Sequence, residues 1–89
     1  MRRKSRMLLV LGDSIREYRT RNGCSQEMLG EMVGLHRTYI GMVERGEKNI
    51  TMQNFYKIAT VLKINVSEVF AVAQEFEAMN DLADSGVGK

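Results

Sequence analysis

One stretch of the sequence, residues 26–45 (QEMLGEMVGLHRTYIGMVER), constrains the fold more than any other part of the chain. Its fifth residue, Gly30, stands where a side chain would collide with a following helix. Its ninth residue, Gly34, stands where the chain must turn and where a left-handed backbone is least costly for glycine. The apolar residues have the spacing that locks two short helices at a steep angle onto a third; they are Leu29, Val33, Leu35, Ile40 and Val43.

Glycines and apolar residues in this register predict a helix-turn-helix, a motif whose second helix enters the major groove of DNA. Ser25 stands just before the first helix and can cap it, because its hydroxyl can accept an unpaired N–H of the first turn. The second helix is expected from about Arg37 to Arg45, and Gly46 closes it. The alternative is an ordinary corner between two helices that has no DNA partner.

Helical signals also cover the chain on either side of the motif. Residues 12–14 (Gly-Asp-Ser) offer capping groups for a first helix that Asn22-Gly23 ends, although an earlier start stays open because the preceding apolar run contains no breaker. Ser67 is expected to cap a fifth helix over about residues 68–82. Thr51 caps a fourth helix, whose apolar positions are Phe55, Ile58, Ala59 and Leu62.

Length and composition limit the function classes. With 89 residues and no proline, the chain is expected to be one compact all-α, five-helix domain, residues 1–89, too short for dinucleotide-binding folds or (β/α) barrels. One His and one Cys cannot supply a usual metal cluster, and no glycine-rich phosphate loop is present, so we expect no catalytic site, no metal and no cofactor.

The longest apolar run, from Met7 to Leu11, is too short to span a membrane. The single cysteine, Cys24, excludes a disulfide framework and suits a reducing compartment. We therefore expect a cytoplasmic protein without a membrane partner. The chain has no room for a separate ligand domain, so no small-molecule ligand is expected.

Charge is distributed unevenly along the chain. Residues 1–21 hold seven basic residues against two acidic ones, whereas residues 64–89 hold one basic residue against five acidic ones. A basic front and an acidic tail suggest a polyanion that faces one end of the molecule, and solvated surface charge explains the asymmetry equally well. The basic arm Arg2-Arg3-Lys4-Arg6 either adds nonspecific attraction to phosphates or does nothing.

The fifth helix carries more apolar residues than a small core can bury. Phe70 and Ala73 fall on one stripe, placed to close the core of the monomer. A second stripe is expected to form the interface of a homodimer; its members are Val69, Val72, Phe76 and Met79. Because dimers of such motifs bind two half-sites about one turn of DNA, ~34 Å, apart, we expect a palindromic operator.

Two short motifs carry a resemblance to a known family. Residues 23–29 (GCSQEML) resemble the G-x-[ST]-Q-E-x-L signature of the lambda-repressor/Cro-like (Xre-type) DNA-binding family, and residues 43–46 (VERG) resemble its [IV]-E-x-G close. The resemblance covers about residues 8–70. Within it, residues 36–40 (HRTYI) followed by residues 48–51 (KNIT) are similar to the controller proteins of restriction–modification systems.

This resemblance implies that the second helix of the motif reads base edges in double-stranded DNA. We expect Arg37 to pair with O6 and N7 of a guanine, which is worth about 1–3 kcal/mol of discrimination, and Thr38 to reach a thymine methyl or a base edge. The family also places Met42, one turn further on, at a base-facing position, where methionine offers only apolar contact. Tyr39 either contacts a phosphate or sugar or packs at the rim.

The resemblance also implies contacts to the DNA backbone. Gln26 stands where the family clamps a phosphate at the N-terminus of the first motif helix, with help from the free N–H groups of that helix end. His36 either touches the backbone or caps the recognition helix. A second phosphate clamp is implied at the start of the following helix, with Lys48 open to the alternative of a solvated loop lysine; its members are Lys48, Asn49 and Thr51.

Two pairs of charged residues have other implied roles. The family pairs Arg19 and Glu44 in a partly buried salt bridge that orients the recognition helix, and removal of one partner would leave an unpaired charge. By family analogy, the exposed carboxylates of Glu27 and Glu31 are candidates for contact with RNA polymerase.

We therefore expect a sequence-specific, dimeric transcription regulator that acts on its own promoter. The resemblance to controllers implies that it activates and represses as its concentration rises, which delays the restriction enzyme relative to the methyltransferase. Two alternatives stay open: a plain repressor from a phage or an antitoxin operon, and a protein-interaction module that keeps the fold without binding DNA.

Overall fold

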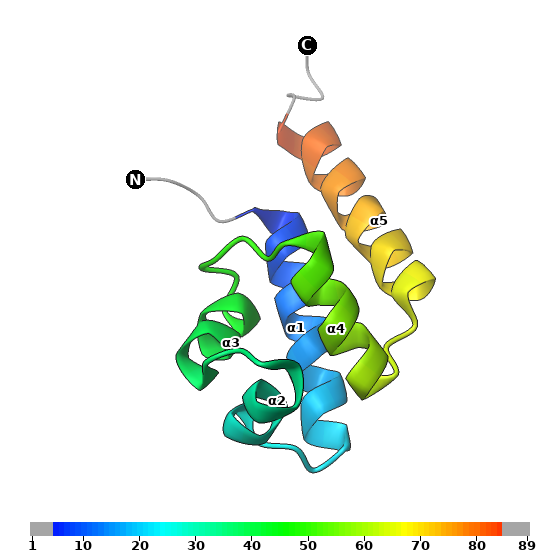
Figure 1. The fold of residues 1–89 in the computed structure, drawn as a ribbon. Helices are drawn as coiled ribbons and strands as arrows, with labels where there is room; N and C mark the ends of the chain where they lie inside the picture. Colours follow the sequence, from blue (N-terminus) through cyan, green and yellow to red (C-terminus); the bar gives the residue numbers. More distant parts are fainter. Residues whose placement is uncertain (1–4, 85–89) are drawn as a thin grey trace.

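Five α-helices and no strands make up residues 5–84, the part of the chain that this computed structural model describes (Figure 1). For residues 80–84 the description covers the helical backbone alone, and Arg2, Arg3 and Lys4 of the basic arm lie outside the described residues. The helices are α1 (Arg6–Arg21), α2 (Gln26–Val33), α3 (Arg37–Glu44), α4 (Met52–Leu62) and α5 (Val66–Asp84). The predicted all-α fold with five helices is confirmed.

α1 begins earlier than the capping pattern at residues 12–14 suggested. Ser5 is its N-cap, and the Ser5 hydroxyl accepts the N–H of Leu8 at 3.4 Å. Gly12 lies inside the helix and has a packing role, because a Cβ at this position would lie 2.3 Å from the carbonyl oxygen of Val43 and 2.8 Å from that of Glu44. Gly12 thus lets α1 and α3 approach to backbone contact.

The helix ends of the motif follow the local sequence. The hydroxyls of Ser25 and Thr51 each accept the N–H three residues further on at 3.0 Å, and they cap α2 and α4. Gly34 ends α2 in the left-handed region with φ 75°. A Cβ at Gly30 would lie 2.3 Å from the carbonyl oxygen of Leu35, so the side chain excluded there would collide with the turn that precedes α3 and not with α3 itself.

The start of α5 differs from the prediction. The Oδ1 atom of Asn65 accepts the N–H of Glu68 and the hydroxyl of Ser67, both at 3.1 Å. Asn65 is therefore the capping residue, and the assignment of that role to Ser67 was wrong. The physical reason is that the asparagine amide oxygen already reaches the unpaired N–H of the first turn.

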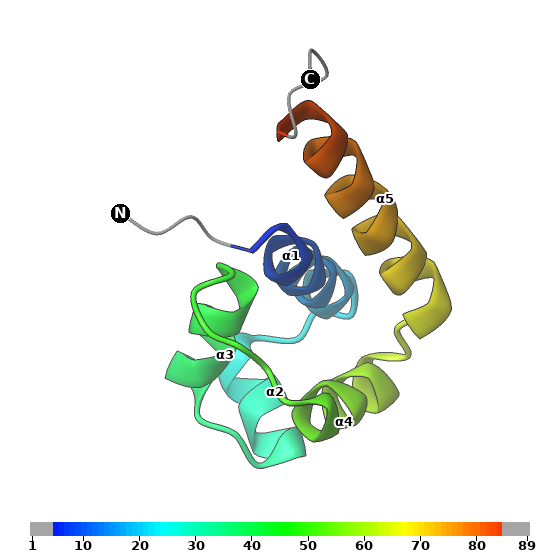
Figure 2. The same ribbon diagram turned by 90° about the horizontal axis from the view of Figure 1, so that it is seen from above.

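The core lies around α1, which is the central helix. Figure 2 looks nearly along α1, with α3 on one side of it and α5 on the other. The apolar residues predicted for the motif and for α4 are buried, except Leu35, which is partly buried. Among the described residues, none of the helices combines the length and apolar character needed to cross a membrane. The most completely buried side chains come from α1, α2, α3 and α4; they are Ile15, Leu29, Ile40 and Ile58.

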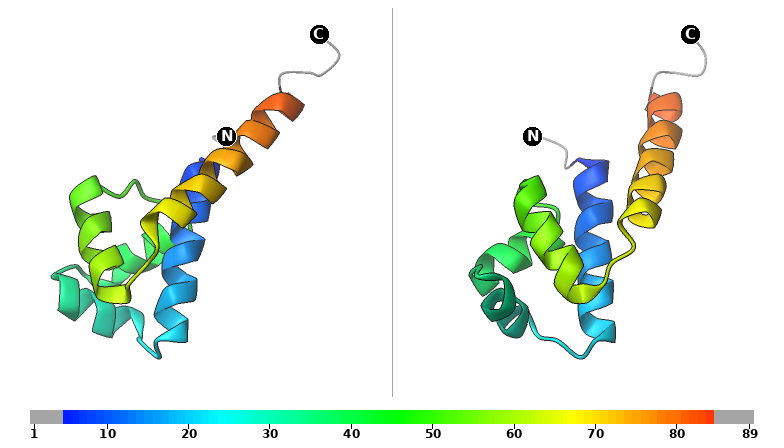
Figure 3. Two further views of the ribbon diagram at one scale, coloured as in Figure 1. Left: turned by 90° about the vertical axis from the view of Figure 1, so that its right-hand side faces the viewer. Right: turned by 45° about the vertical axis from the view of Figure 1, so that its right-hand side comes forward.

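α5 buries one side and exposes the other. The ring of Phe70 stacks on that of Phe55 with 5.8 Å between centroids, and Ala73 is 1% exposed. Val69 is only 6% exposed, so its assignment to the dimer stripe was wrong: four residues before Ala73, it lies on the same face of the helix and packs in the core. The C-terminal half of α5 extends beyond the other helices (Figure 3). Three members of the stripe remain exposed: Val72, Phe76 and Met79.

Candidate nucleic-acid interface

The first turn of α3 presents two exposed side chains, Arg37 and Thr38, at a fixed helix start. His36 is the N-cap, and its Nδ1 accepts the N–H of Thr38 at 3.0 Å. The ring therefore has the capping role, one of the two that the sequence left open, while its contact with DNA stays a prediction. Met42, one turn further along α3, is half-buried and offers less surface than Arg37.

A second feature follows along the same face of α3. Residues four apart share a helix face, so Gly41 and the C-cap residue Arg45 continue the line that Arg37 begins. A Cβ at Gly41 would lie 3.2 Å from Nη1 of Arg45 and 3.4 and 3.5 Å from Oε1 and Nε2 of Gln26. The absent side chain therefore leaves room for the guanidinium of Arg45 and the amide of Gln26 close to the backbone of α3.

Arg45 is a candidate that the sequence analysis missed, because it treated this residue only as the end of the motif. The side chain is 57% exposed, and its Nε lies 3.1 Å from Oε2 of Glu47. The sequence signal that indicates it is the spacing of Arg37, Gly41 and Arg45, which follow one another at intervals of four residues. Arg45 adds a positive charge beside Gln26, where the family resemblance places a phosphate.

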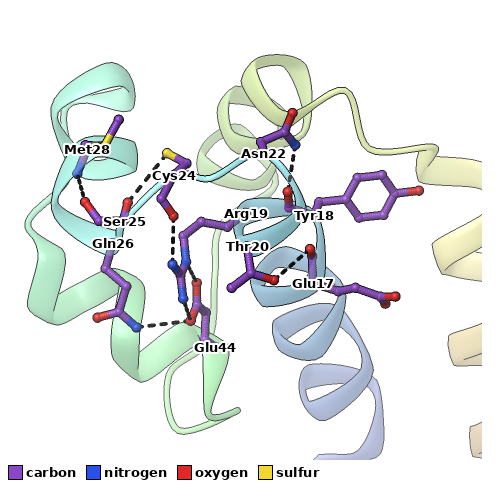
Figure 4. A network of polar contacts seen from close by, with 10 residues as sticks. All are labelled: Glu17, Tyr18, Arg19, Thr20, Asn22, Cys24, Ser25, Gln26, Met28 and Glu44. Atoms are coloured by element: carbon purple, nitrogen blue, oxygen red, sulfur yellow. Dashed lines mark hydrogen bonds and ion pairs between the residues drawn. The ribbon is translucent and has the colours of Figure 1, made fainter.

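The side chain of Gln26 is held in place by a hydrogen bond to a buried carboxylate. Its Nε2 donates a hydrogen bond to Oε1 of Glu44 at 3.0 Å, and the side chain is half-buried (Figure 4). An amide nitrogen carries two hydrogens, so a second N–H is left for another acceptor. Gln26 is also the first residue of α2, and the N-terminal end of a helix favours an anion through its N–H groups and dipole.

Glu44 joins α1 to the motif (Figure 4). Arg19 donates from Nε to Oε2 of Glu44 at 2.6 Å and from Nη2 to Oε1 at 3.0 Å, and its Nη1 donates to the carbonyl oxygen of Cys24 at 2.8 Å. The side chains of Arg19 and Glu44 are 12% and 3% exposed. The hydrogen bond with Glu44 is the main cause that raises the pKa of Arg19, against the lowering effect of burial. The expected ion pair is present and fixes α3 against α1.

The loop between α3 and α4 carries the other predicted backbone contacts. Lys48 and Asn49 are exposed there. The hydroxyl of Tyr39 donates to the carbonyl oxygen of Asn49 at 3.5 Å and accepts from Nδ2 of Asn54 at 3.4 Å. Tyr39 therefore packs at the rim with its hydroxyl at the loop, while its contact with a phosphate or a sugar stays a prediction. The hydroxyl oxygen of Thr51 is engaged in the cap of α4, while its hydrogen stays available as a donor.

Acidic side chains stand beside the start of α3. Oε1 of Glu27 lies 3.7 Å from Nη1 of Arg37. Glu31, one turn further along α2, is exposed, and these three residues line a shallow groove between α2 and the start of α3. The two carboxylates assigned to a polymerase contact therefore adjoin the surface assigned to DNA.

The exposed side of α5 is separate from this surface. Val72 and Phe76 line a groove between α1 and α5 together with Val10 and Tyr18 of α1. Since α3 and α5 lie on opposite sides of α1 (Figure 2), a contact made by α5 leaves the exposed face of α3 uncovered.

Comparison with known proteins relates the chain to regulators that contain this motif. A model of the helix-turn-helix family matches residues 15–69. The chain is 45% identical over 60 residues to control protein C.SmaI of Serratia marcescens, covering 67% of this chain and 71% of that protein. It is 36% identical over 62 residues to control protein C.BamHI of Bacillus amyloliquefaciens, covering 68% and 76%. The crystal structure of the restriction-modification controller protein C.AhdI from Aeromonas hydrophila matches with a TM-score of 0.64 at 45% identity, covering 70% of this chain and 90% of that chain.

Proposed function

The chain belongs to the helix-turn-helix family of DNA-binding transcription regulators, and from this premise we propose that it reads a specific operator through the first turn of α3. The family match and the similarity to controller proteins confirm the resemblance that the motifs carried. Members of this family are regulators and not enzymes.

One observation supports the proposal most directly. The exposed Arg37 and Thr38 project from a helix whose start is fixed by the His36 cap and whose far end is fixed by the Glu44 network. A guanidinium on such a support can meet O6 and N7 of a guanine without any further ordering of the backbone that carries it. Arg37 and Thr38 are therefore the proposed base readers, with Met42 as a weaker apolar contact.

The proposed backbone contacts flank these base readers on two sides. Gln26 and Arg45 both lie close to Gly41, and they offer an amide N–H and a guanidinium to one stretch of phosphates. Lys48 and Asn49 in the next loop offer a second set of phosphate contacts. The hydroxyls of Thr51 and Tyr39 lie beside them. Such contacts set the register of α3 on DNA, whereas the base contacts give the sequence preference.

We propose that the regulator is a dimer formed through α5. Val72, Phe76 and Met79 are 52%, 41% and 68% exposed, so three apolar side chains of one stripe on α5 are in contact with solvent. A two-fold symmetric dimer carries two copies of α3, and the palindromic operator that we propose matches that symmetry.

The similarity to restriction–modification control proteins supports a narrower proposal for the role of this regulator. We propose that it controls its own promoter, first as an activator and then as a repressor as its concentration rises. Glu27 and Glu31 on α2 are the proposed polymerase contacts. A plain repressor would bind its operator and lower transcription at every concentration.

Selection of bound sequences from a random pool of DNA duplexes tests the main proposal. We expect one palindromic sequence to emerge, and the substitution Arg37→Ala to weaken binding to it by about 1–3 kcal/mol while the preference at one base pair is relaxed. Arg21→Ala is the matched control, because Arg21 is an exposed arginine at the end of α1 that pairs with Glu17. A pool from which no sequence emerges would support the protein-interaction module instead. Transcription from the selected operator at rising protein concentration then separates a controller from a plain repressor.

A further inference from the structure

The guanidinium proposed to read bases already has an anionic neighbour in the free protein. Nη1 of Arg37 lies 3.7 Å from Oε1 of Glu27, and the two side chains are 63% and 66% exposed. Glu27 is in the first turn of α2, next to Gln26, whose side chain is proposed to contact a phosphate. The same carboxylate therefore stands at the border between the base-reading and the backbone-contacting parts of the surface.

We propose that Glu27 is a specificity-determining residue that acts through Arg37. On random DNA the carboxylate of Glu27 remains paired with the guanidinium of Arg37, so Arg37 adds little attraction to phosphates. On the operator, a guanine edge replaces the carboxylate as the partner of Arg37. This inference rests on the proposed function, because it assigns a role to Glu27 in the discrimination that Arg37 is proposed to provide.

The argument depends on what each partner offers to a guanidinium. An exposed ion pair is weak, so it yields readily to a better partner. A guanine presents two acceptors in the fixed geometry that an arginine fork matches, and the bidentate contact compensates for the lost pair. A phosphate next to Glu27 attracts the guanidinium of Arg37, and at the same time it repels the carboxylate of Glu27. Nonspecific binding, which depends on counterion release by unpaired cations, is therefore reduced more than operator binding.

Glu31 provides a matched control on the same helix. It is an exposed glutamate one turn after Glu27 and lines the same groove, while the carboxylate within ion-pair distance of Arg37 is that of Glu27. Glu27→Gln and Glu31→Gln change the net charge equally. They differ in whether the carboxylate removed is the one that lies within ion-pair distance of Arg37.

The experiment measures dissociation constants of the full-length variants for the selected operator and for a random duplex over a range of salt concentrations. For Glu27→Gln we expect affinity for the random duplex to rise about two- to fivefold, the range of a lost exposed ion pair. The salt slope on random DNA should steepen by about one phosphate contact. Operator affinity should rise less, so the ratio of the two affinities falls. For Glu31→Gln the ratio should stay at the wild-type value.

A double-mutant cycle separates a role through Arg37 from a local effect on α2, where an acidic residue in the first turn also stabilises the helix. In an Arg37→Gln background, Glu27→Gln should have no further effect on the ratio. An effect that persists in this background, or equal effects of Glu27→Gln and Glu31→Gln, would overturn the inference while leaving the proposed function in place. A wild-type protein without preference for any sequence would overturn both.

Discussion

Arg19 and Glu44 form a two-point contact behind the recognition helix, with N–O distances of 2.6 and 3.0 Å. The contact joins residues that are 25 positions apart in the sequence. Glu44 also accepts the amide of Gln26, so one buried carboxylate connects α1, α2 and α3. The position of the surface proposed to meet DNA therefore depends on an ion pair that does not itself face DNA.

Replacement of Arg19 by methionine should lower the free energy of unfolding by about 3 kcal/mol, because Glu44 would remain buried without its charged partner. Urea denaturation measures this loss. The matched control is Arg21→Met, since Arg21 and its partner Glu17 are 62% and 56% exposed and such pairs contribute at most about 1 kcal/mol. Equal losses for the two variants would contradict a structural role of the buried pair.

The pH dependence of this pair follows from the raised pKa of Arg19. A raised pKa in the folded state means that the stabilising positive charge is fully present below the ordinary pKa of an arginine. It is lost only as the pH rises through the raised value. The difference in unfolding free energy between wild type and Arg19→Met should therefore be the same at neutral and at mildly alkaline pH. A difference that shrinks within that interval would show that the charge of Arg19 is not what stabilises the fold.

Replacement of Gly12 by alanine should destabilise the fold by about 1–3 kcal/mol or more, because the added Cβ would meet two backbone carbonyl oxygens of α3. A backbone cannot move aside as a flexible side chain can, so α1 and α3 must separate. Thermal unfolding measures the change. Asp13→Ala in the same helix is the control, since Asp13 is exposed and the substitution should have little effect.

Replacement of Gly41 by alanine should have the opposite pattern. The added Cβ would press on the ends of two flexible side chains, Arg45 and Gln26, at 3.2–3.5 Å, and alanine favours a helix over glycine by about 1 kcal/mol. Unfolding free energy should therefore be kept or raised, while operator affinity falls several-fold because both proposed phosphate contacts are displaced. A variant that binds the operator as wild type does would exclude this pair from the interface.

Replacement of Arg45 by glutamine should weaken binding to every duplex to a similar extent and reduce the salt slope by about one. The base preference should not change, because a phosphate contact positions the protein without reading sequence. Arg21→Gln removes the same charge at the end of α1 and should leave the salt slope nearly unchanged. A change of base preference in Arg45→Gln would assign this residue to base reading instead.

Replacement of Phe76 by glutamate should convert the proposed dimer to a monomer, since the side chain is 41% exposed in the isolated chain and a charge would be buried in the interface. Sedimentation at tens of micromolar protein measures the mass. Tyr56→Glu on α4 is the control, because Tyr56 is 71% exposed and lies outside the α5 surface. A wild-type protein that is monomeric at this concentration would reject the dimer.

Local chemistry in the sequence was sufficient to predict the motif. The caps at Ser25 and Thr51 and the left-handed turn at Gly34 depend on groups within four residues of each other, so the sequence order alone reveals them. The buried positions of α2, α3 and α4 repeat with the helical period and were predicted for the same reason. The motifs around Gln26 and Glu44 also led to the family.

Tertiary structure decided the features that depend on contacts between distant segments. Whether Gly12 starts a helix or lies within one depends on the backbone of α3, and whether Val69 faces the core or solvent depends on how α5 docks on α1. The approach of both Arg45 and Gln26 to Gly41, and the ion pair of Arg37 with Glu27, likewise require the angle between α2 and α3. The order of residues was sufficient to predict the five helices, because capping and helical periodicity are local. Only the packed structure determined which side chains meet, because those contacts depend on how the helices are placed in space.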